Sequence, residues 1–141
     1  MTTIAYRNGM LAADTRMIQG TAIIGNVVKI VRREDGLLAG GAGDCAWVQA
    51  FHRWFLGHEE GDPPELDDNC KGIIVRPDKT VEMFEPMGTI EFKPPFVAMG
   101  SGKEFALGAM WMGATAEQAV RAAMELDPGT GGNITVLTHG E

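Results

Sequence analysis

Thr2, which directly follows the initiator methionine, has the clearest capacity for chemistry in this chain. If Met1 is removed, Thr2 carries both a hydroxyl group and a free α-amine that titrates near neutrality. A threonine hydroxyl needs an adjacent base to act as a nucleophile, and an N-terminal amine always lies close to its own side chain. Many unrelated chains begin with Met-Thr, so Thr2 indicates an N-terminal nucleophile only in combination with other residues.

Asp14 and Lys29 are candidates for tuning this nucleophile. Lys29 interrupts the apolar run of residues 27–31, and lysine is rarely buried without a partner. Burial lowers the pKa of a lysine and a nearby carboxylate raises it, which is the balance that a catalytic lysine requires. In the alternative interpretation, Asp14 only ends a strand and Lys29 reaches water from an edge strand.

A hairpin is predicted to bring Thr2 and Asp14 together. Asn8-Gly9 is a strong signal for a two-residue type I′ turn. Such a turn sets the register of the strands on either side, so that Thr3 lies opposite Asp14. A carboxylate is thereby expected within one residue of Thr2.

Asp35-Gly36 predicts the turn of a second hairpin. A two-residue turn there would place Lys29 opposite Ala42, and the nearby glycines would pass close to the start of the chain. The Gly40 amide is then a candidate oxyanion donor. The glycines also fit a simpler interpretation, in which they relax the strand before a helix.

Six short motifs follow one another along the chain. They are Thr2-Thr3-Ile4, Ala13-Asp14-Thr15-Arg16, Gly25-Asn26-Val27-Val28-Lys29-Ile30, Ala39-Gly40-Gly41-Ala42-Gly43-Asp44-Cys45, Ala98-Met99-Gly100-Ser101-Gly102 and Asp127-Pro128-Gly129-Thr130-Gly131-Gly132. In this order they resemble the motifs of proteasome β-subunits and of the bacterial peptidase HslV, which are N-terminal nucleophile (Ntn) hydrolases. The first hairpin is shorter than in that family, by equal amounts on each arm, so its cross-strand pairs are unchanged.

The resemblance implies a role for each matching residue. Thr2 is the nucleophile, and Asp14 and Lys29 tune it. The Gly40 amide is the oxyanion donor, while the Thr2 amine and its water are held by Ser101, Asp127 and Thr130. The implied specificity pocket is apolar, which suggests cleavage after hydrophobic residues. Its lining residues are Met17, Val27, Val31, Leu38, Ala42 and Ala46.

The expected fold is a single α+β domain spanning residues 1–141. Strand patterns dominate its first half, and helices flank strands in its second half. The resemblance sharpens this expectation to a four-layer αββα Ntn-hydrolase sandwich. The sandwich is shortened, because residues 57–64 are rich in glycine, proline and acidic residues where the family has a second helix.

Local signals predict several further elements. Asp44 can cap a helix with an aromatic face, which core packing explains better than ligand binding. Residues 77–79 are predicted to turn a third hairpin, and Thr115 to Gln118 form a capping-box pattern. Lys103 follows a strand and a small-residue turn, but without the Ser or Thr of a phosphate-binding loop.

Composition limits the function classes. With 141 residues, 45% hydrophobic and 22% charged, the chain can bury one core. A net charge of −7 argues against nucleic-acid or anionic-membrane partners. The two cysteines are too few for a disulfide framework, and no metal-ligand spacing links them to histidines. Without a secretory signal or a long apolar run, a cytoplasmic protein that uses no cofactor or metal is expected.

The predicted function is that of a threonine endopeptidase acting on peptides or unfolded proteins. The resemblance implies a homo-oligomeric ring or stacked rings, with an ATP-dependent unfoldase as a possible partner. Two alternatives remain open from the sequence. One is a catalytically silent subunit that uses the fold only for assembly, as a retained Met1 would favour. The other is an amidase that acts on a small molecule with the same nucleophile.

Overall fold

The computed structural model describes residues 1–140, which form eleven strands and three helices. The strands are β1 (Thr3–Arg7), β2 (Met10–Ala13), β3 (Arg16–Gln19), β4 (Ala22–Asn26), β5 (Ile30–Arg32), β6 (Leu38–Ala42), β7 (Lys71–Val75), β8 (Val81–Glu85), β9 (Gly88–Phe92), β10 (Phe96–Gly100) and β11 (Thr135–Thr138). The helices are α1 (Cys45–Leu56), α2 (Lys103–Trp111) and α3 (Ala116–Leu126).

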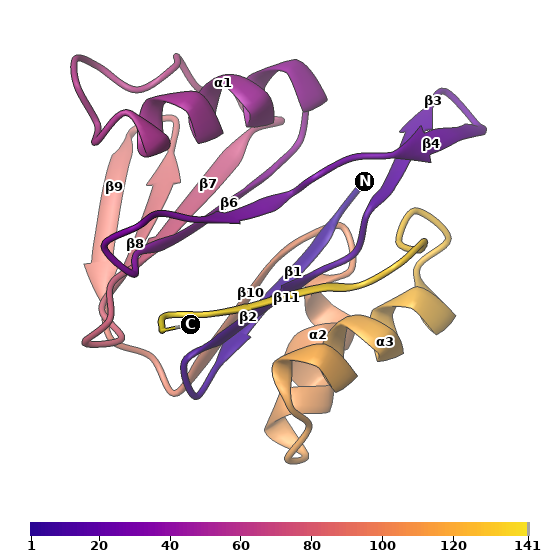
Figure 1. The fold of residues 1–141 in the computed structure, drawn as a ribbon. Coiled ribbons are helices and arrows are strands. Elements are labelled where there is room, and N and C mark those ends of the chain that lie inside the picture. Colours follow the sequence, from indigo (N-terminus) through magenta and orange to yellow (C-terminus); the bar gives the residue numbers. More distant parts are fainter. Residues whose placement is uncertain (141) are drawn as a thin grey trace.

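Two antiparallel sheets lie face to face, and helices cover their outer surfaces (Figure 1). β10, β1, β2 and β11 form a four-stranded sheet in that order, and β5 to β9 form a five-stranded sheet. α1 packs on the five-stranded sheet, and α2 and α3 pack on the four-stranded sheet. The layers are therefore helix, sheet, sheet and helix, which confirms the expected α+β class.

Three apolar clusters fill the spaces between these layers. The central cluster joins the sheets and contains Ile4 and Leu11 from one sheet and Leu38 and Ile73 from the other. A second cluster lies beneath α2 and α3, and a third, largely aromatic cluster lies beneath α1. The aromatic face of α1 thus packs in the core, as expected. Burying one large apolar side chain stabilises the fold by about 1.5–3 kcal/mol.

The first hairpin has the predicted turn and register. Asn8 and Gly9 have φ values of 53° and 79°, and left-handed values at both central positions are typical of a type I′ turn. β1 and β2 pair with Ile4 opposite Ala13. One residue further on, the Asp14 amide donates to the Thr3 carbonyl at 3.2 Å, so the chain start and the carboxylate are neighbours.

The predicted register of the second hairpin is wrong by one residue. Ile30 pairs with Gly40, so Lys29 lies opposite Gly41, whose amide donates to the Lys29 carbonyl at 3.1 Å. Ala42, the predicted partner of Lys29, instead lies opposite Lys71 of β7.

A three-residue loop causes this shift. The Arg33 amide donates to the Leu37 carbonyl at 2.9 Å, which encloses residues 34–36, and Gly36 has a φ of 90°. Such loops, with glycine in the left-handed position, are a common alternative to two-residue turns. The Arg33 guanidinium also binds the Asp35 carboxylate within the loop, which favours the longer turn.

Residues 21–31, which contain the apolar run around Lys29, do not form one continuous strand. β3 and β4 instead make a separate two-stranded ribbon that projects from the sandwich (Figure 1). Ile23 and Ile24 in this ribbon are exposed. β4 ends at Asn26 and β5 begins at Ile30, so Lys29 lies in the connecting segment, where it is buried.

The helices begin at the predicted caps. The Asp44 carboxylate accepts a hydrogen bond from the Ala46 amide at 2.9 Å, and Thr115 with Gln118 forms the capping box of α3. Residues 57–70 contain no second helix, in agreement with the shortened layer expected from the sequence. The exposed edge strand β9 was not predicted. Within residues 1–140, no helix is long and apolar enough to cross a bilayer.

Candidate active site

Thr2 lies where three cavities meet. One of about 380 Å³, here called the large cavity, lies on the side of Ser101, and a second cavity of about 230 Å³ lies beside Met17. A small cavity of about 10 Å³ lies beside Val27. Thr2 and Gly43 line all three. The chain start lies near the base of the β3–β4 ribbon (Figure 1), and Thr2 itself is buried.

The Asp14 carboxylate is fully buried and accepts hydrogen bonds at both oxygens. Lys29 Nζ lies 3.1 Å from Oδ1 and 3.0 Å from Oδ2. The Thr3 amide donates to Oδ1 at 3.0 Å, and the Gly131 amide donates to Oδ2 at 3.1 Å. A buried charge needs such pairing. The carboxylate therefore joins the chain start, Lys29 and the turn after α3 at one point.

Lys29 also contacts the peptide bond that joins Met1 to Thr2. Its Nζ donates to the Met1 carbonyl oxygen at 2.9 Å. Burial lowers the pKa of the Lys29 ammonium below its usual value, and the Asp14 carboxylate opposes this effect. The ammonium is thus held against the start of the chain with its proton bound less tightly than usual.

Ser101 lies between the Thr2 nitrogen and Asp127. The Thr2 amide donates to Ser101 Oγ at 3.2 Å, and Ser101 Oγ donates to Asp127 Oδ2 at 2.6 Å. Because an ionised carboxylate can only accept, the Ser101 proton points to Asp127 and a Ser101 lone pair faces the Thr2 nitrogen. Ser101 is therefore oriented as an acceptor for hydrogens on that nitrogen.

Thr130 extends the same network toward β1. Its Oγ1 donates to Asp127 Oδ2 at 2.6 Å and accepts from Thr3 Oγ1 at 2.7 Å. The Gly129 amide donates to Asp127 Oδ1 at 3.2 Å. Burial raises the pKa of Asp127, but the hydrogen bonds from Ser101, Thr130 and Gly129 outweigh it, and the resulting pKa lies below the usual value. Asp127 is therefore an anion at neutral pH.

The glycine-rich segment approaches Thr2 at Gly43. Gly40, the predicted oxyanion donor, lies inside β6 between Ile30 and Ile73 and does not line the three cavities. Gly43 has a φ of 117°, a value that favours glycine. The structure thus places Gly43, and not Gly40, beside the space around Thr2.

The six predicted pocket residues do not meet in one pocket. Those that line a cavity each line a different one: Met17 the second, Val27 the small and Ala42 the large cavity. The other three residues line none of the cavities. Val31 packs against the core beneath α1, Leu38 is fully buried in the central core, and Ala46 lies on the exposed face of α1. Met17 lies in the projecting β3–β4 ribbon, whereas Val31 and Leu38 lie in the five-stranded sheet.

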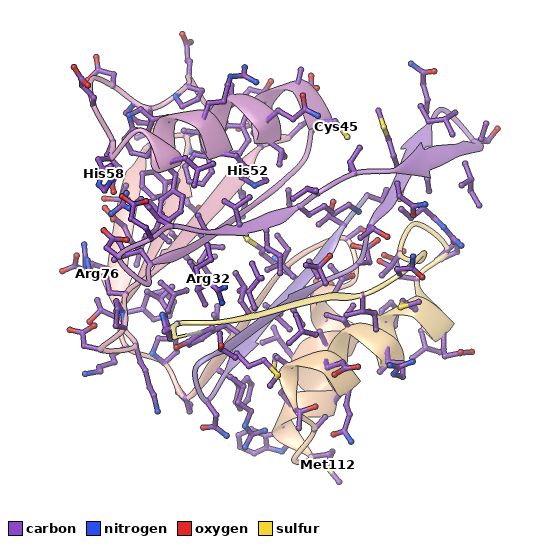
Figure 2. The ribbon with its side chains drawn as sticks, viewed as in Figure 1. Arg32, Cys45, His52, His58, Arg76 and Met112 are labelled. Atoms are coloured by element: carbon purple, nitrogen blue, oxygen red, sulfur yellow. The ribbon has the colours of Figure 1, made fainter. Side chains whose placement is uncertain are left out.

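Thr3 and His52 belong to the site although sequence reasoning did not select them. Thr3 joins the two networks, because its amide binds Asp14 and its hydroxyl binds Thr130. His52 Nε2 donates to the Lys29 carbonyl at 3.2 Å and points from α1 toward the sheet (Figure 2). Burial lowers the pKa of His52. The signal that could have identified His52 is its position on the otherwise apolar face of α1, where a polar side chain needs a hydrogen-bond partner.

A cysteine thiol also borders the site. Cys45, at the start of α1 (Figure 2), lines the second and small cavities, and Cys70 is buried. Both are free thiols. In residues 1–140, no group of His, Cys, Asp and Glu side chains has a geometry that could hold a metal ion.

No protein-family model matches the chain, and no curated protein matches it. Solved structures do match. The fold is similar to that of Thiobacillus denitrificans BPH in complex with epoxomicin, with a TM-score of 0.71 and 22% sequence identity over 99% of each chain. Another structure of Thiobacillus denitrificans BPH matches with a TM-score of 0.70 and 21% identity, over 99% of this chain and 98% of that one. The chain is therefore similar in fold to BPH over its whole length.

Proposed function

We propose that this protein is a threonine-type peptidase of the Ntn-hydrolase kind, with Thr2 as the nucleophile after removal of Met1. The observation that carries the proposal is that both polar atoms of the Met1–Thr2 peptide bond are already held. Its oxygen accepts from Lys29 Nζ at 2.9 Å, and its nitrogen donates to Ser101 Oγ at 3.2 Å. When Met1 leaves, this nitrogen becomes the α-amine, and one Lys29 N–H is released toward Thr2.

Acyl transfer begins when Thr2 Oγ1 attacks the carbonyl carbon of a peptide bond and its proton passes to the α-amine. Ser101 accepts a hydrogen from this amine, so the amine lone pair stays free for the incoming proton. The tetrahedral intermediate then collapses, the C–N bond breaks, and the ammonium returns the proton to the leaving nitrogen. In the second half, the amine takes a proton from water and the resulting hydroxide attacks the ester carbonyl carbon. The bond from that carbon to Thr2 Oγ1 then breaks, the acid product leaves, and the ammonium returns its proton to Thr2 Oγ1.

Lys29 and Gly43 supply the electrostatics of this reaction. The positive charge of Lys29, fixed by Asp14, lowers the cost of ionising the Thr2 hydroxyl. The developing oxyanion needs backbone donors. Gly43 lines all three cavities together with Thr2. The backbone amides at Gly43 are therefore better candidates for the oxyanion donor than the Gly40 amide.

The similarity to the BPH complex supports the proposal. Epoxomicin is a proteasome inhibitor, and a protein of the same fold is described in complex with it. Met17 and Ile18 give the second cavity an apolar part beside the polar Arg16, Gln19 and Asp44, and this part supports a hydrophobic residue on the acyl side of the cleaved bond. The proposed setting is a cytoplasmic homo-oligomer that degrades peptides or unfolded proteins, with an ATP-dependent unfoldase as a partner.

The test uses Thr2→Ala, with Thr21→Ala in the exposed β3–β4 turn as the matched control. We expect the wild-type protein to begin at Thr2 by intact mass, to hydrolyse hydrophobic peptides and to gain the mass of one epoxomicin molecule. Thr2→Ala should lose hydrolysis by a factor of about 10³ or more and gain no mass, without a change in melting temperature. Wild-type turnover by Thr2→Ala would contradict the proposal.

A second candidate function is that of a catalytically silent subunit. The Met1 side chain packs against Gly129, where an added Cβ would clash with it, and Met1 lines both the large and the second cavity. In a chain that keeps Met1, the Thr2 nitrogen is a peptide nitrogen and cannot act as a base, and Met1 partly fills the site. An intact mass that includes Met1, together with no epoxomicin adduct, would favour this function.

A further inference from the structure

The large cavity differs from the other two in its position relative to the two networks around Thr2. It lies at the open end of the sandwich, between Gly100 and Ser101 of one sheet and Lys71 and Met83 of the other. Ser101 lines this cavity and neither of the others. Lys29 lines the other two and not this one. The cavity is therefore on the side of the future α-amine.

This position identifies the part of the substrate that the cavity would receive. The inference rests on the proposed peptidase function, in which the Thr2 amine takes the hydroxyl proton and gives it to the leaving nitrogen. A proton can pass directly only between groups within hydrogen-bond distance, so the leaving nitrogen has to lie on the amine side of Thr2. The segment that follows the cleaved bond consequently enters the large cavity, and the acyl side chain lies on the Lys29 side of Thr2, where Met17 lines the second cavity.

The walls of the large cavity are positively charged in an acidic protein. The chain has a net charge of −7, yet Lys71 and Lys103 both line this cavity, and Asp68 is the one acidic residue among the described residues that line it. Lys71 lies 3.5 Å from Glu85, a contact long enough to leave Lys71 donors for a ligand. No carboxylate in residues 1–140 lies within ion-pair distance of Lys103.

The start of α2 adds to this charge. α2 begins at Lys103, which lines the cavity, and the acidic residue of its first turn, Glu104, does not line it. The first amides of a helix carry a partial positive charge. Both lysines and this helix start favour an anion over a cation or a neutral amide in the cavity.

We propose that the large cavity binds the leaving segment of the substrate and selects one that carries a carboxylate, with Lys71 and Lys103 as specificity-determining residues. The carboxylate has two sources in a peptide. It is either an acidic side chain just after the cleaved bond or the free C-terminus of a short leaving segment. Both present the same planar anion to the lysines, so the experiment has to separate them.

The experiment compares fluorogenic peptides that share one acyl segment and differ only after the cleaved bond. Their leaving segments contain Glu, Gln or Lys with an amidated C-terminus, or Gln with a free C-terminus. The protein is used after its N-terminus has been confirmed as Thr2. We expect kcat/KM for a carboxylate-bearing segment to exceed that of amidated Gln by about fivefold, and Lys to be the poorest. A preference for amidated Glu assigns the acidic side chain, and a preference for free-terminus Gln assigns the C-terminus.

Variants connect this preference with the cavity. Lys103→Gln and Lys71→Gln should each reduce the preference, and Lys103→Glu should reverse it toward the Lys peptide. Lys79→Gln, in the β7–β8 turn outside the cavity, is the matched control and should leave the preference unchanged. Equal kcat/KM for all four peptides in the unmodified protein would overturn this inference and leave the peptidase function standing. No hydrolysis of any peptide by a protein with a free Thr2 would overturn the peptidase function and the cavity assignment with it.

Discussion

The Lys29 ammonium and the Asp14 carboxylate form an ion pair that is almost closed to solvent. Lys29 Nζ lies 3.0 Å from Asp14 Oδ2, and the two side chains are 4% and 0% exposed. Asp14 follows β2 in one sheet, and Lys29 precedes β5 in the other. The pair therefore links the two sheets at the end where Thr2 lies, and removing either partner leaves the other as a buried, uncompensated charge.

Lys29→Met should destabilise the fold by about 3–5 kcal/mol, because it leaves the Asp14 charge buried without a cation. Adding Asp14→Asn should restore much of the loss without restoring hydrolysis. Lys29→Arg should also be inactive, because a guanidinium is larger, planar and always charged. Urea unfolding and peptide turnover measure these effects. A Lys29→Met protein that unfolds and turns over like the wild type would show that the pair is dispensable.

Asp127→Asn should slow the chemical step more than it weakens substrate binding. An asparagine presents an NH₂ group in place of one carboxylate oxygen, so its single oxygen can accept from Ser101 and Thr130 or from the Gly129 amide, but not from all three as Asp127 does. The negative charge that fixes the Ser101 proton, and with it the lone pair that faces the Thr2 amine, is also lost. We expect kcat to fall while KM changes little, with about 1–3 kcal/mol lost in stability. Asp62→Asn, in an exposed loop, is the control.

Asp127 also makes a defined contribution to acid sensitivity. Its pKa is lowered in the fold, so the unfolded chain binds this proton more readily than the folded protein does. The stability that Asp127 contributes is fully present above its unfolded pKa of about 3.9 and is lost as the pH falls through the lower, folded value. In Asp127→Asn, unfolding free energies measured between about pH 2 and 5 should depend less steeply on pH, whereas Asp62→Asn should follow the wild type.

His52 should make stability depend on pH in a higher range. Burial lowers its pKa, so protonation favours the unfolded chain. Its contribution is fully present above an unfolded pKa of about 6.5 and is lost as the pH falls toward the folded value. His52→Gln removes the titration and keeps a donor for the Lys29 carbonyl. As the pH is lowered from about 7 to 5, the melting temperature of His52→Gln should fall less than that of the wild type.

His58→Gln is the control for this measurement, since His58 is exposed and pairs with Glu34. Identical slopes in the wild type and in His52→Gln would mean that His52 does not titrate on unfolding.

Gly100→Ala should be far more damaging than Gly113→Ala. The two glycines have similar left-handed φ values of 98° and 106°, so the backbone strain of about 1–2 kcal/mol is shared. A Cβ at Gly100 would clash with the Thr2 carbonyl, whereas one at Gly113 would meet open space. Calorimetry and peptide turnover should show an additional loss of stability and of activity in Gly100→Ala alone. Equal melting temperatures for the two variants would rule out this clash.

Self-association should depend on the end of α2. Trp111 and Met112 are 79% and 84% exposed and lie at the far end of the helix layer, where Figure 2 labels Met112. A contiguous exposed apolar patch marks an interaction surface, and these two residues are adjacent in the chain. Light scattering at micromolar concentration should give a mass above the 15.2 kDa of one chain, and Trp111→Glu should lower it. Met87→Glu, at the isolated β8–β9 turn, should not. A monomer mass for the wild type at every concentration and salt tested would contradict the proposed oligomer.

Local chemistry explains which parts of the fold were predictable. Asn8-Gly9 admits one favoured turn type, so the register that brings Asp14 to the chain start follows from it. Asp35-Gly36 was compatible with two loop lengths, and the choice between them depends on the Arg33–Asp35 contact. That contact belongs to the tertiary packing of Arg33, which also binds the Phe55 carbonyl of α1. The pattern alone was therefore insufficient to set the second register.

The candidate site shows the same limit. A buried lysine within an apolar run was recognisable, because an unpaired ammonium is costly there. The burial of the surrounding residues could not be recognised in the same way. Ile23 and Ile24 are exposed in β4, yet two isoleucines in the sequence are equally typical of a buried core strand. Thr3 and His52 act through contacts with residues distant in the chain, and a single sequence carries no record of such contacts.

Hydrogen bonds also link the two sheets at the end of the sandwich opposite Thr2. His139 joins the two sheets there, because its Nδ1 donates to the Gly36 carbonyl oxygen at 2.9 Å while its Nε2 accepts from the Tyr6 hydroxyl at 2.9 Å. A carbonyl oxygen can only accept, so the neutral imidazole carries its proton on Nδ1. Arg32 adds a bond to the Thr138 carbonyl at 3.1 Å.

The two sheets are thus held at both ends, by Lys29 and Asp14 at one and by His139 at the other. They cannot shear past one another without breaking these bonds. The cavities around Thr2 are bordered by Met1, by Met17 of the β3–β4 ribbon and by Asp68 and Asn69. The sheets that carry the reacting groups are thus fixed to each other independently of these bordering parts.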